Sequence, residues 1–341
     1  MFNGAMINNF LMMFLAILIC FTGCKTDKNK PDVDNISVSL EFNRLDKDIF
    51  SIKDSLTVSD LILLQTKYNS FFDIYCRNML RLPAPNDSLQ VVQLNGFKND
   101  PDIKNVYSAS DSIYTEGEVE RIKSGLTTFF KHLKYYYPEK FTPEVVTFIS
   151  GFNYNVVTTD SVMGIGLDMY LGGDSKFYPS LGFPKYMFRK FSKEYIVNDC
   201  IKGWFQSEYD VETVKKELLN QLIYEGKLLY FCDAMAPDLH DSVKIGYTGE
   251  QLKWCRENEK QVWSFFIEKK LLFSTNQKEY IRFIQDGNAT QGFPEGAPGK
   301  TACYIGWQII KAFMKNNNVT LQQLLNENDA QKILNQSGYK P

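Results

Sequence analysis

Histidine is almost missing from this sequence of 341 residues, which contains only His132 and His240. Neither belongs to a His-Glu-x-x-His motif, and a histidine-based zinc site needs at least two suitably spaced imidazole rings. The sequence also has no Gly-x-Ser-x-Gly motif and no phosphate-binding loop. These absences argue against the chemistry that such motifs carry, and we expect no bound metal ion and no cofactor.

Paired cysteines are missing as well, because no Cys-x-x-Cys motif occurs, and a zinc site built from cysteines is not expected. Of the seven cysteines, Cys20 and Cys24 lie near the N-terminus. The other five are an odd number, so at least one thiol stays free even if one or two disulfides form. We expect most of them to be small buried hydrophobic residues, and the sequence does not fix any pairing. These five are Cys76, Cys200, Cys232, Cys255 and Cys303.

The sequence has no excess of positive charge, since its net charge is −2 at pH 7 and its pI is about 5.9. Nucleic-acid-binding proteins usually carry a basic patch or stripe, so we expect no nucleic acid partner. Hydrophobic residues make up 44% of the chain and aromatic residues 14%. That content is enough to bury a large core and argues against extended disorder.

An uncharged apolar run near the N-terminus, Phe10–Phe21, has only about 12 residues, whereas a membrane-spanning helix needs ~20. It fits the apolar core of a secretory signal. The run ends in the small residues Thr22 and Gly23, followed by Cys24. A cysteine directly after a small residue at the cut resembles a bacterial lipoprotein signal. The resemblance implies cleavage before Cys24 and acylation of its sulfur. An ordinary signal peptide and an uncleaved anchor are the alternatives.

This interpretation divides the chain into a signal peptide (1–23), a polar tether (24–38) and a single α-rich globular body (39–341). The tether contains proline and polar residues, so it lets the body stand off the membrane to which the lipid attaches it. Lys25 follows Cys24, and no acidic cluster follows it. Such a cluster would resemble a surface-export tag. We therefore expect a lipid-anchored protein of the outer membrane that faces the periplasm.

Within the body, hydrophobic periodicity predicts helices, then a small sheet, then more helices. This order favours an α+β fold that is predominantly α-helical, with helices flanking a small antiparallel sheet. An N-terminal helical part covers residues 39–143, with a short strand at 38–42. A second part covers residues 144–341 and begins with a three-stranded antiparallel meander. The expected strands of the meander are 144–150, 153–158 and 162–171. The expected helices are 59–82, 116–137, 192–206, 211–235, 249–271, 276–285, 300–316 and 320–327.

One carboxylate falls on the apolar face of a predicted helix. Glu225 lies at i+7 from Leu218 and i+3 from Leu222, so a rotation of 100° per residue places it within the apolar stripe. A carboxylate there is costly to bury unless a cation or hydrogen-bond donors compensate it. Glu225 is therefore either a metal-binding or catalytic carboxylate, or a structural glutamate. In the preceding helix, Asp199 lies at the edge of the apolar stripe and is expected to be solvated or to cap the helix.

The predicted strand over 164–171 is the third feature of interest. It contains several glycines beside Asp168, and small residues let another backbone approach closely. We expect an edge strand to which an extended peptide from a partner could add. The alternative is that the next helix packs over the strand.

Several segments of the body carry a resemblance to a known family. They are Gly166–Gly172, Tyr186–Phe191, Leu222–Lys227, Lys244–Thr248, Gln251–Cys255, Trp263 with Phe266–Glu268, and Pro298–Gly299 followed by Tyr304–Gln308. These segments resemble the gliding-motility lipoprotein GldB family of the Bacteroidetes. The resemblance runs from the lipoprotein signal to the C-terminal Ser337–Pro341 and is most specific over residues 222–308. It implies a role in gliding motility and in the associated secretion machinery of the cell envelope, with protein partners from that machinery.

That family is in turn similar to zinc peptidases of the gluzincin type. The similarity implies a zincin-like architecture for residues 144–341, with Glu225 at the place of a glutamate zinc ligand. Asn198 and Lys202 stand where two histidines would be, and Asp199 stands where the general base would be. Asparagine is a poor zinc ligand and a lysine ammonium repels a cation. The resemblance therefore implies a peptidase-like protein without catalysis, in which Lys202 could pair with Glu225.

The leading functional hypothesis is a membrane-tethered, non-catalytic lipoprotein that binds a protein partner. The alternative is an active metal-dependent hydrolase or peptidase that uses Asp168, Asp199 and Glu225 to hold a hard cation. A structural scaffold without a groove is the third possibility. Three carboxylates converging within ~5 Å would favour a metal site. A contact between Lys202 and Glu225 would favour the non-catalytic protein.

Overall fold

The computed structural model describes residues 31–82 and 86–341. The predicted signal peptide, Cys24 and the first part of the tether lie outside these residues. Among the residues described, none of the helices combines the length and apolar character that crossing a membrane requires. The body is predominantly helical with one small sheet, in agreement with the expected α+β class.

The sheet is mixed, so the predicted antiparallel meander is wrong. The strand order is β1(Phe42–Arg44), β2(Glu144–Phe148), β4(Val162–Gly166) and β3(Val156–Thr158). β2 pairs in parallel with both β1 and β4, and only β3 and β4 pair antiparallel. The prediction assumed that strands adjacent in sequence pair with each other, which is common but not general. Here β3 follows β2 in the sequence but lies at the edge of the sheet, and β4 occupies the place beside β2.

β4 is an interior strand with a partner on both sides. The prediction of an edge strand over 164–171 is therefore wrong, and β4 is followed by a 3-10 turn, η3(Leu167–Tyr170). The glycines of this segment serve packing inside the body. A Cβ atom on Gly166 would lie 1.9 Å from the backbone oxygen of Tyr154. This strand is consequently closed to an added peptide strand.

Both faces of the sheet are buried, and alternate residues point to opposite faces. Val146 and Phe148 belong to a core shared with the N-terminal helices, and Val145 belongs to a larger core on the other face. Met163 and Ile165 of β4 face that larger core as well. A sheet covered on both faces reads as near-continuous apolar runs in the sequence, which explains why these strands were recognised although their pairing was not.

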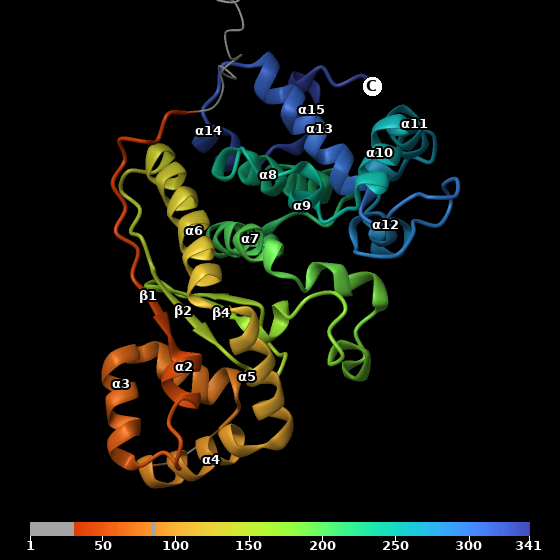
Figure 1. Cartoon of the computed structure of the whole chain (residues 1–341). Helices are drawn as coiled ribbons and strands as arrows, with labels where there is room; N and C mark the ends of the chain where they lie inside the picture. Colours follow the sequence, from red (N-terminus) through yellow and green to blue (C-terminus); the bar gives the residue numbers. More distant parts are fainter. Residues whose placement is uncertain (1–30, 83–85) are drawn as a thin grey trace, which may run out of the picture.

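The N-terminal helices lie on one side of the sheet (Figure 1). Rings of Phe71 and Tyr75 pack against Phe148 of β2. The predicted helix 59–82 is confirmed as far as residue 73, after which the chain continues as a π-helix. Two helices between residues 87 and 113 were not anticipated. The elements of this group are α2(Leu45–Phe50), α3(Val58–Asp73), η2(Ile74–Met79), α4(Asp87–Asn99) and α5(Pro101–Ile113).

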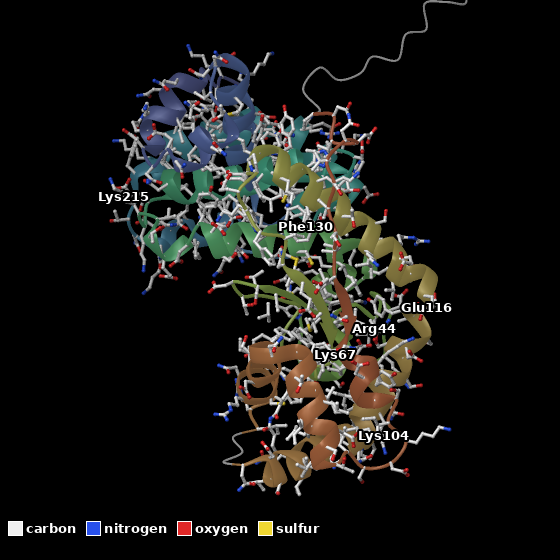
Figure 2. The ribbon with its side chains drawn as sticks, turned by 90° about the vertical axis from the view of Figure 1, so that its left-hand side faces the viewer. Arg44, Lys67, Lys104, Glu116, Phe130 and Lys215 are labelled. Carbon is white, nitrogen blue, oxygen red and sulfur yellow. The ribbon has the colours of Figure 1, made fainter. Side chains whose placement is uncertain are left out.

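α6(Glu116–Tyr136) runs from the sheet to the opposite group of helices and matches its prediction to one residue (Figure 1). Arg44, at the end of β1, lies where the sheet meets the N-terminal helices (Figure 2). Its guanidinium binds both carboxylate oxygens of the buried Asp46, which also accepts a hydrogen bond from Thr147 of β2. This network holds β1 in register beside β2.

The larger group of helices lies on the other side of the sheet, where α7(Ile196–Glu208) covers it and packs on α8(Leu218–Met235). α8 and α13(Thr301–Asn316) form the central helix pair, and they meet at glycines. A Cβ atom on Gly306 would lie 1.7 Å from the backbone oxygen of Leu222. The two backbones can approach this closely only because neither residue at the crossing, Gly226 or Gly306, has a side chain.

The remaining elements surround this pair. The predicted helix 211–235 begins at Leu218, because the preceding residues form a 3-10 turn. The predicted helix 249–271 is broken at Asn258, and the last helix was not anticipated. The five cysteines of the body are buried and free, in agreement with their expected packing role. The elements are η4(Tyr178–Leu181), η5(Lys185–Lys190), η6(Lys193–Tyr195), η7(Val211–Thr213), α9(Asp241–Ile245), α10(Gly249–Glu257), α11(Glu259–Glu268), η8(Leu271–Phe273), α12(Gln277–Ile284), α14(Leu321–Asn326) and α15(Ala330–Ser337).

Candidate functional site

Three of the predicted site residues lie in one group of interacting charges. Asp199 and Lys202 are on α7 and Glu225 is on α8. They interact electrostatically with three further charged residues that sequence analysis did not select. We call this group the charged cluster. Its members are Lys190, Asp199, Lys202, Glu225, Asp286 and Lys300.

The closest contacts of the charged cluster involve Asp286, which follows α12. Lys190 donates a hydrogen bond to the carboxylate of Asp286, and the Lys300 Nζ lies 3.6 Å from the same oxygen. Burial alone would raise the pKa of Asp286, but Lys300 and Lys190 outweigh it and hold that pKa below its usual value. Burial, together with Lys300, lowers the pKa of Lys190 to about 8. A substantial fraction of Lys190 is therefore neutral slightly above physiological pH.

Local backbone geometry places the two lysines. Lys300 is the N-cap of α13 and has a φ of 59°, a left-handed conformation that costs free energy for a residue with a side chain. Lys190 ends η5, whose Arg189 donates hydrogen bonds to the backbone oxygens of Gly246 (2.6 Å) and Tyr247 (2.8 Å). Gly246 has a φ of 83°, and the Lys190 Cε lies 3.0 Å from where its Cβ would be. A larger residue at 246 would therefore be strained in its backbone and would crowd the Lys190 side chain.

Asp199 differs from the prediction that it is solvated or caps a helix. Its carboxylate accepts a hydrogen bond of 2.9 Å from the hydroxyl of Tyr170. Burial raises its pKa, opposed by Lys202 and by the Tyr170 hydrogen bond. It is therefore a half-buried member of the charged cluster and does not cap a helix.

Lys202 and Glu225 do not form the predicted ion pair, since none of the ion pairs within 4.0 Å among the described residues joins them. Both side chains are half-buried. Glu225 interacts instead with Lys300, and Lys202 with Asp199. The cation near Glu225 is thus Lys300, from a segment that is distant in sequence, and not Lys202.

The structure places Asn198 and Asp168 in other roles. Asn198 is fully buried, and its Nδ2 donates to the backbone oxygen of Val243 at 3.2 Å. Asp168 is also fully buried, and its Oδ2 accepts from the backbone nitrogens of Ser150 (3.0 Å) and Phe152 (2.6 Å). Burial raises the pKa of Asp168 to about 6. Asp168 thus holds the turn after β2.

Ion pairs within the charged cluster can link the elements that carry its members. The six members carry three positive and three negative formal charges and come from η5, α7, α8 and the two ends of the α12–α13 connection. Across residues 31–82 and 86–341, no group of three or more His, Cys, Asp or Glu side chains is positioned to hold a metal ion. Burial raises the pKa of Cys303 well above its usual value and that of Cys232 to about 12. Both thiols near the cluster therefore stay protonated and are poor nucleophiles.

A weak signal for two of the three unselected members was present in the sequence. Lys190 lies inside the segment Tyr186–Phe191, and Lys300 directly follows Pro298–Gly299; both segments carry the family resemblance. Asp286 had no such signal. Spacing along the chain could not reveal them, because they approach α7 and α8 only through the tertiary fold.

Comparison with known proteins gives one match. A family model described as gliding motility protein GldB matches residues 26–341. No curated protein and no solved structure matches the chain.

Proposed function

The chain belongs to the family of gliding motility protein GldB, and from that premise we propose that it acts in gliding motility as a lipid-anchored, non-catalytic protein of the cell envelope. We further propose that it binds a protein partner of the gliding and secretion machinery. The observation that carries this proposal is the family match, which begins two residues after Cys24 and extends to the last residue.

The proposed lipid anchor is supported by the sequence around Cys24. A short apolar run, a small residue and a cysteine stand in the order that lipoprotein signals require. The polar residues that follow would connect the acylated cysteine to the first buried residue of the body, Val33. We place the protein at the outer membrane, facing the periplasm, because no acidic cluster follows Cys24.

The proposed absence of catalysis is supported by the charged cluster. Where a peptidase-like body would carry two histidine ligands, Asn198 binds a backbone oxygen and Lys202 adds a positive charge near Asp199. A cation would be repelled by the three lysines of the cluster. We propose that this part is a peptidase-like shell in which ion pairs replace zinc chemistry.

Anchoring and motility can be tested together in the native organism. A strain lacking the gene is complemented with the wild-type chain, with Cys24→Ser, or with Cys20→Ser as the matched control within the signal peptide. We expect Cys24→Ser to lose fatty-acid labelling, to leave the membrane fraction and to fail to restore gliding on glass. Cys20→Ser should behave like the wild type.

Three results would each contradict a part of the proposal. Normal gliding of the strain that lacks the gene would refute the role in motility. Fatty-acid labelling that persists in the Cys24→Ser chain would refute the anchor. About one equivalent of zinc in the purified chain would refute the replacement of zinc chemistry.

A further inference from the structure

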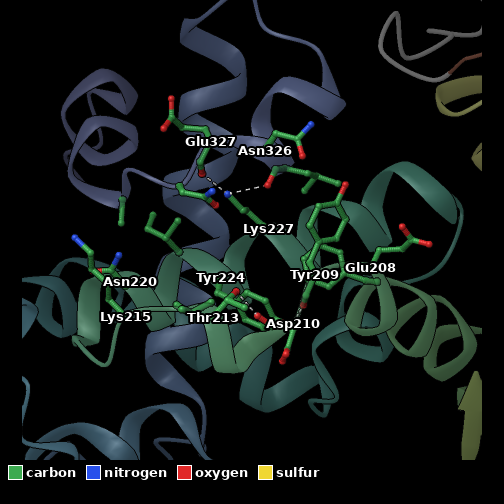
Figure 3. A pocket seen from close by; sticks show the side chains of 16 residues that line it. Glu208, Tyr209, Asp210, Thr213, Lys215, Asn220, Tyr224, Lys227, Asn326 and Glu327 are labelled. Carbon is green, nitrogen blue, oxygen red and sulfur yellow. Dashed lines mark hydrogen bonds between the residues drawn. The ribbon is translucent and has the colours of Figure 1, made fainter.

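A cavity of about 530 Å³ lies between the α7–α8 connection and the α14–α15 connection, and none of its residues belongs to the charged cluster. Its volume is within the range of pockets that hold small molecules or short peptide segments. Phe205, Tyr209 and Tyr224 form its aromatic part, and Lys227 lies among the polar groups (Figure 3). Nothing in the proposed function accounts for this cavity.

Lys227 is the most unusual residue of the cavity. It is only 7% exposed, and its ammonium group donates to the backbone oxygens of Leu325 (3.2 Å) and Glu327 (2.5 Å), where α14 ends. An ammonium has three donors, so one remains beyond these two neutral acceptors. No carboxylate of the described chain lies within 4.0 Å of it. Burial lowers the pKa of Lys227 to about 8, against the opposing effect of Glu327.

The acidic residues of the cavity already have partners. Glu327 forms an ion pair of 2.6 Å with Lys332, and Glu208 forms one with Lys140. Asp210 accepts a hydrogen bond of 2.9 Å from the backbone nitrogen of Glu212. The cations Lys215 and Lys227 have no such carboxylate partner in the part of the chain that the structure describes. Lys227 is therefore a buried cation that faces the cavity without a carboxylate partner of its own, whereas Glu208 and Glu327 are each paired with another lysine.

Carboxamide groups supply the remaining polarity. Asn220, Asn326 and Asn328 line the cavity, and within the described residues their side chains make no hydrogen bond to the protein. Each carboxamide offers two donors and an acceptor, the complement of a peptide group. Asn220 and Lys215 stand on one side of Lys227, and Asn326 on the other (Figure 3).

We infer that this cavity binds a carboxylate of a peptide, with Lys227 as the charge partner and the three asparagines as partners of the adjoining peptide groups. The inference deepens the proposed function, on which it rests, because it names the chemical group that a protein partner would present. The carboxylate can be a chain terminus or an aspartate or glutamate side chain, and both satisfy the same ammonium.

A peptide selection tests this inference. The purified, immobilised full chain is offered random hexapeptides with free C-terminal carboxylates and an equal amount with C-terminal amides, and the bound peptides are identified by mass spectrometry. We expect peptides with a carboxylate to be recovered about tenfold more than amidated peptides without Asp or Glu, as a charged hydrogen bond allows. Recovery of amidated peptides that contain Asp or Glu separates side-chain from terminal carboxylates. Equal recovery of all classes would overturn the inference.

Lys98 provides a matched control for Lys227. It is 3% exposed and also donates to two backbone oxygens, those of Ile52 (2.5 Å) and Asp54 (2.7 Å), but it does not line this cavity. Lys227→Met should abolish the preference for carboxylates, and Lys98→Met should keep it. A Lys227→Met chain that selects like the wild type would overturn the inference.

A second variant keeps the test decisive if Lys227→Met does not fold. Asn220→Ala combined with Asn328→Ala changes two residues that are not buried, so the fold should persist. We expect recovery of carboxylate peptides to fall about threefold, and unchanged recovery would overturn the inference. Failure of this selection would leave the cellular tests of anchoring and motility untouched, because those tests use variants of Cys24 and no added peptide.

Discussion

At the scale of single residues, the charged cluster shows which electrostatic partners sequence patterns can identify. Helical spacing selected Asp199 and Glu225, the family resemblance added Lys202, and the three lie on the neighbouring helices α7 and α8. Sequence patterns could not identify the partners, because Lys190, Asp286 and Lys300 lie in turns and connections outside α7 and α8 and approach them only in the tertiary fold. The predicted Lys202–Glu225 pair fails for this reason, and the close pair is Lys190–Asp286.

Double-mutant cycles should distinguish the two pairs. Lys190→Met and Asp286→Asn should show a coupling free energy of about 1 kcal/mol or more, because the two side chains are hydrogen-bonded and partly shielded from water. Lys202→Met and Glu225→Gln should couple by less than ~0.5 kcal/mol. Urea denaturation of the single and double variants gives both values. A larger coupling for the second pair would contradict the geometry of the cluster.

Lys227 should make stability depend on pH. Its folded pKa of about 8 lies below the unfolded value of ~10.4, so folding disfavours the protonated form. The penalty is fully present below pH 8 and fades as the pH rises to 10.4. The free energy of unfolding of the wild type should therefore rise relative to that of Lys227→Met over this interval, by at most ~3 kcal/mol.

Denaturation curves of both chains at pH 7.5, 8.5 and 9.5 measure this difference. Tyrosine ionisation and other groups common to both chains cancel in the comparison. A constant difference across the three pH values would mean that the ammonium of Lys227 is not penalised by burial.

At the scale of elements, the crossing of α8 and α13 is the most demanding contact. Gly306→Ala would place a methyl group against the backbone of Leu222, and backbone atoms cannot turn aside as side chains can. We expect a loss of roughly 3 kcal/mol or more in the free energy of unfolding, in the upper range for point substitutions. Thermal and urea denaturation provide the measurement.

Gly96→Ala is the control for this substitution. Gly96 lies within α4, and nothing stands within 4 Å of the position that its Cβ would occupy. Alanine is the better helix former, so this change should stabilise the protein by ~0.4–1 kcal/mol. If both substitutions had the same effect, the loss at Gly306 would not come from the helix crossing.

The helices also show which of their bounds the local sequence determines. The bounds of α6 were predicted to one residue, because apolar residues recur along it with a period of 3.6 residues and Pro138 ends the pattern. The helix 249–271 was predicted as continuous because the apolar period runs across Asn258, where the chain ends α10 and starts α11. α4 was missed although Asn86 caps it, because its buried face is narrow and contains Gln90 and Lys98.

At the scale of the whole molecule, the fold class and part of the secondary structure could be predicted from the sequence, and the topology of the sheet could not. The parallel pairing of β1 with β2 depends on contacts such as Arg44–Asp46–Thr147, which join segments about a hundred residues apart. No local pattern records such a contact. The predicted peptide site is absent because β4 is paired on both sides. The cavity beside Lys227 forms only where the α14–α15 connection meets α8 in the tertiary fold.

We expect the first part of the tether to contribute nothing to the stability of the body. Joining Cys24 directly to Val33 removes the first part of the predicted tether, and we expect the midpoint of urea denaturation to stay unchanged. Joining Cys24 to Leu45 also removes β1 and the Arg44 contact with Asp46, and this chain should not fold cooperatively. Cooperative unfolding of the second chain at the wild-type midpoint would show that β1 is dispensable.

The parallel β1–β2 pair also delays the closing of the sheet. The proposed signal peptide leads the unfolded chain across the membrane with its N-terminal end first, and Phe42 cannot meet Val145 until the intervening segments have crossed. When crossing keeps pace with synthesis at ~5–20 residues per second, that wait is roughly 5–20 s. Through that time α3 carries apolar surface whose cover, including Val146 and Phe148, has not yet emerged. The chain is thus most prone to aggregation during this interval, and a chaperone in the compartment that it enters would have to hold it.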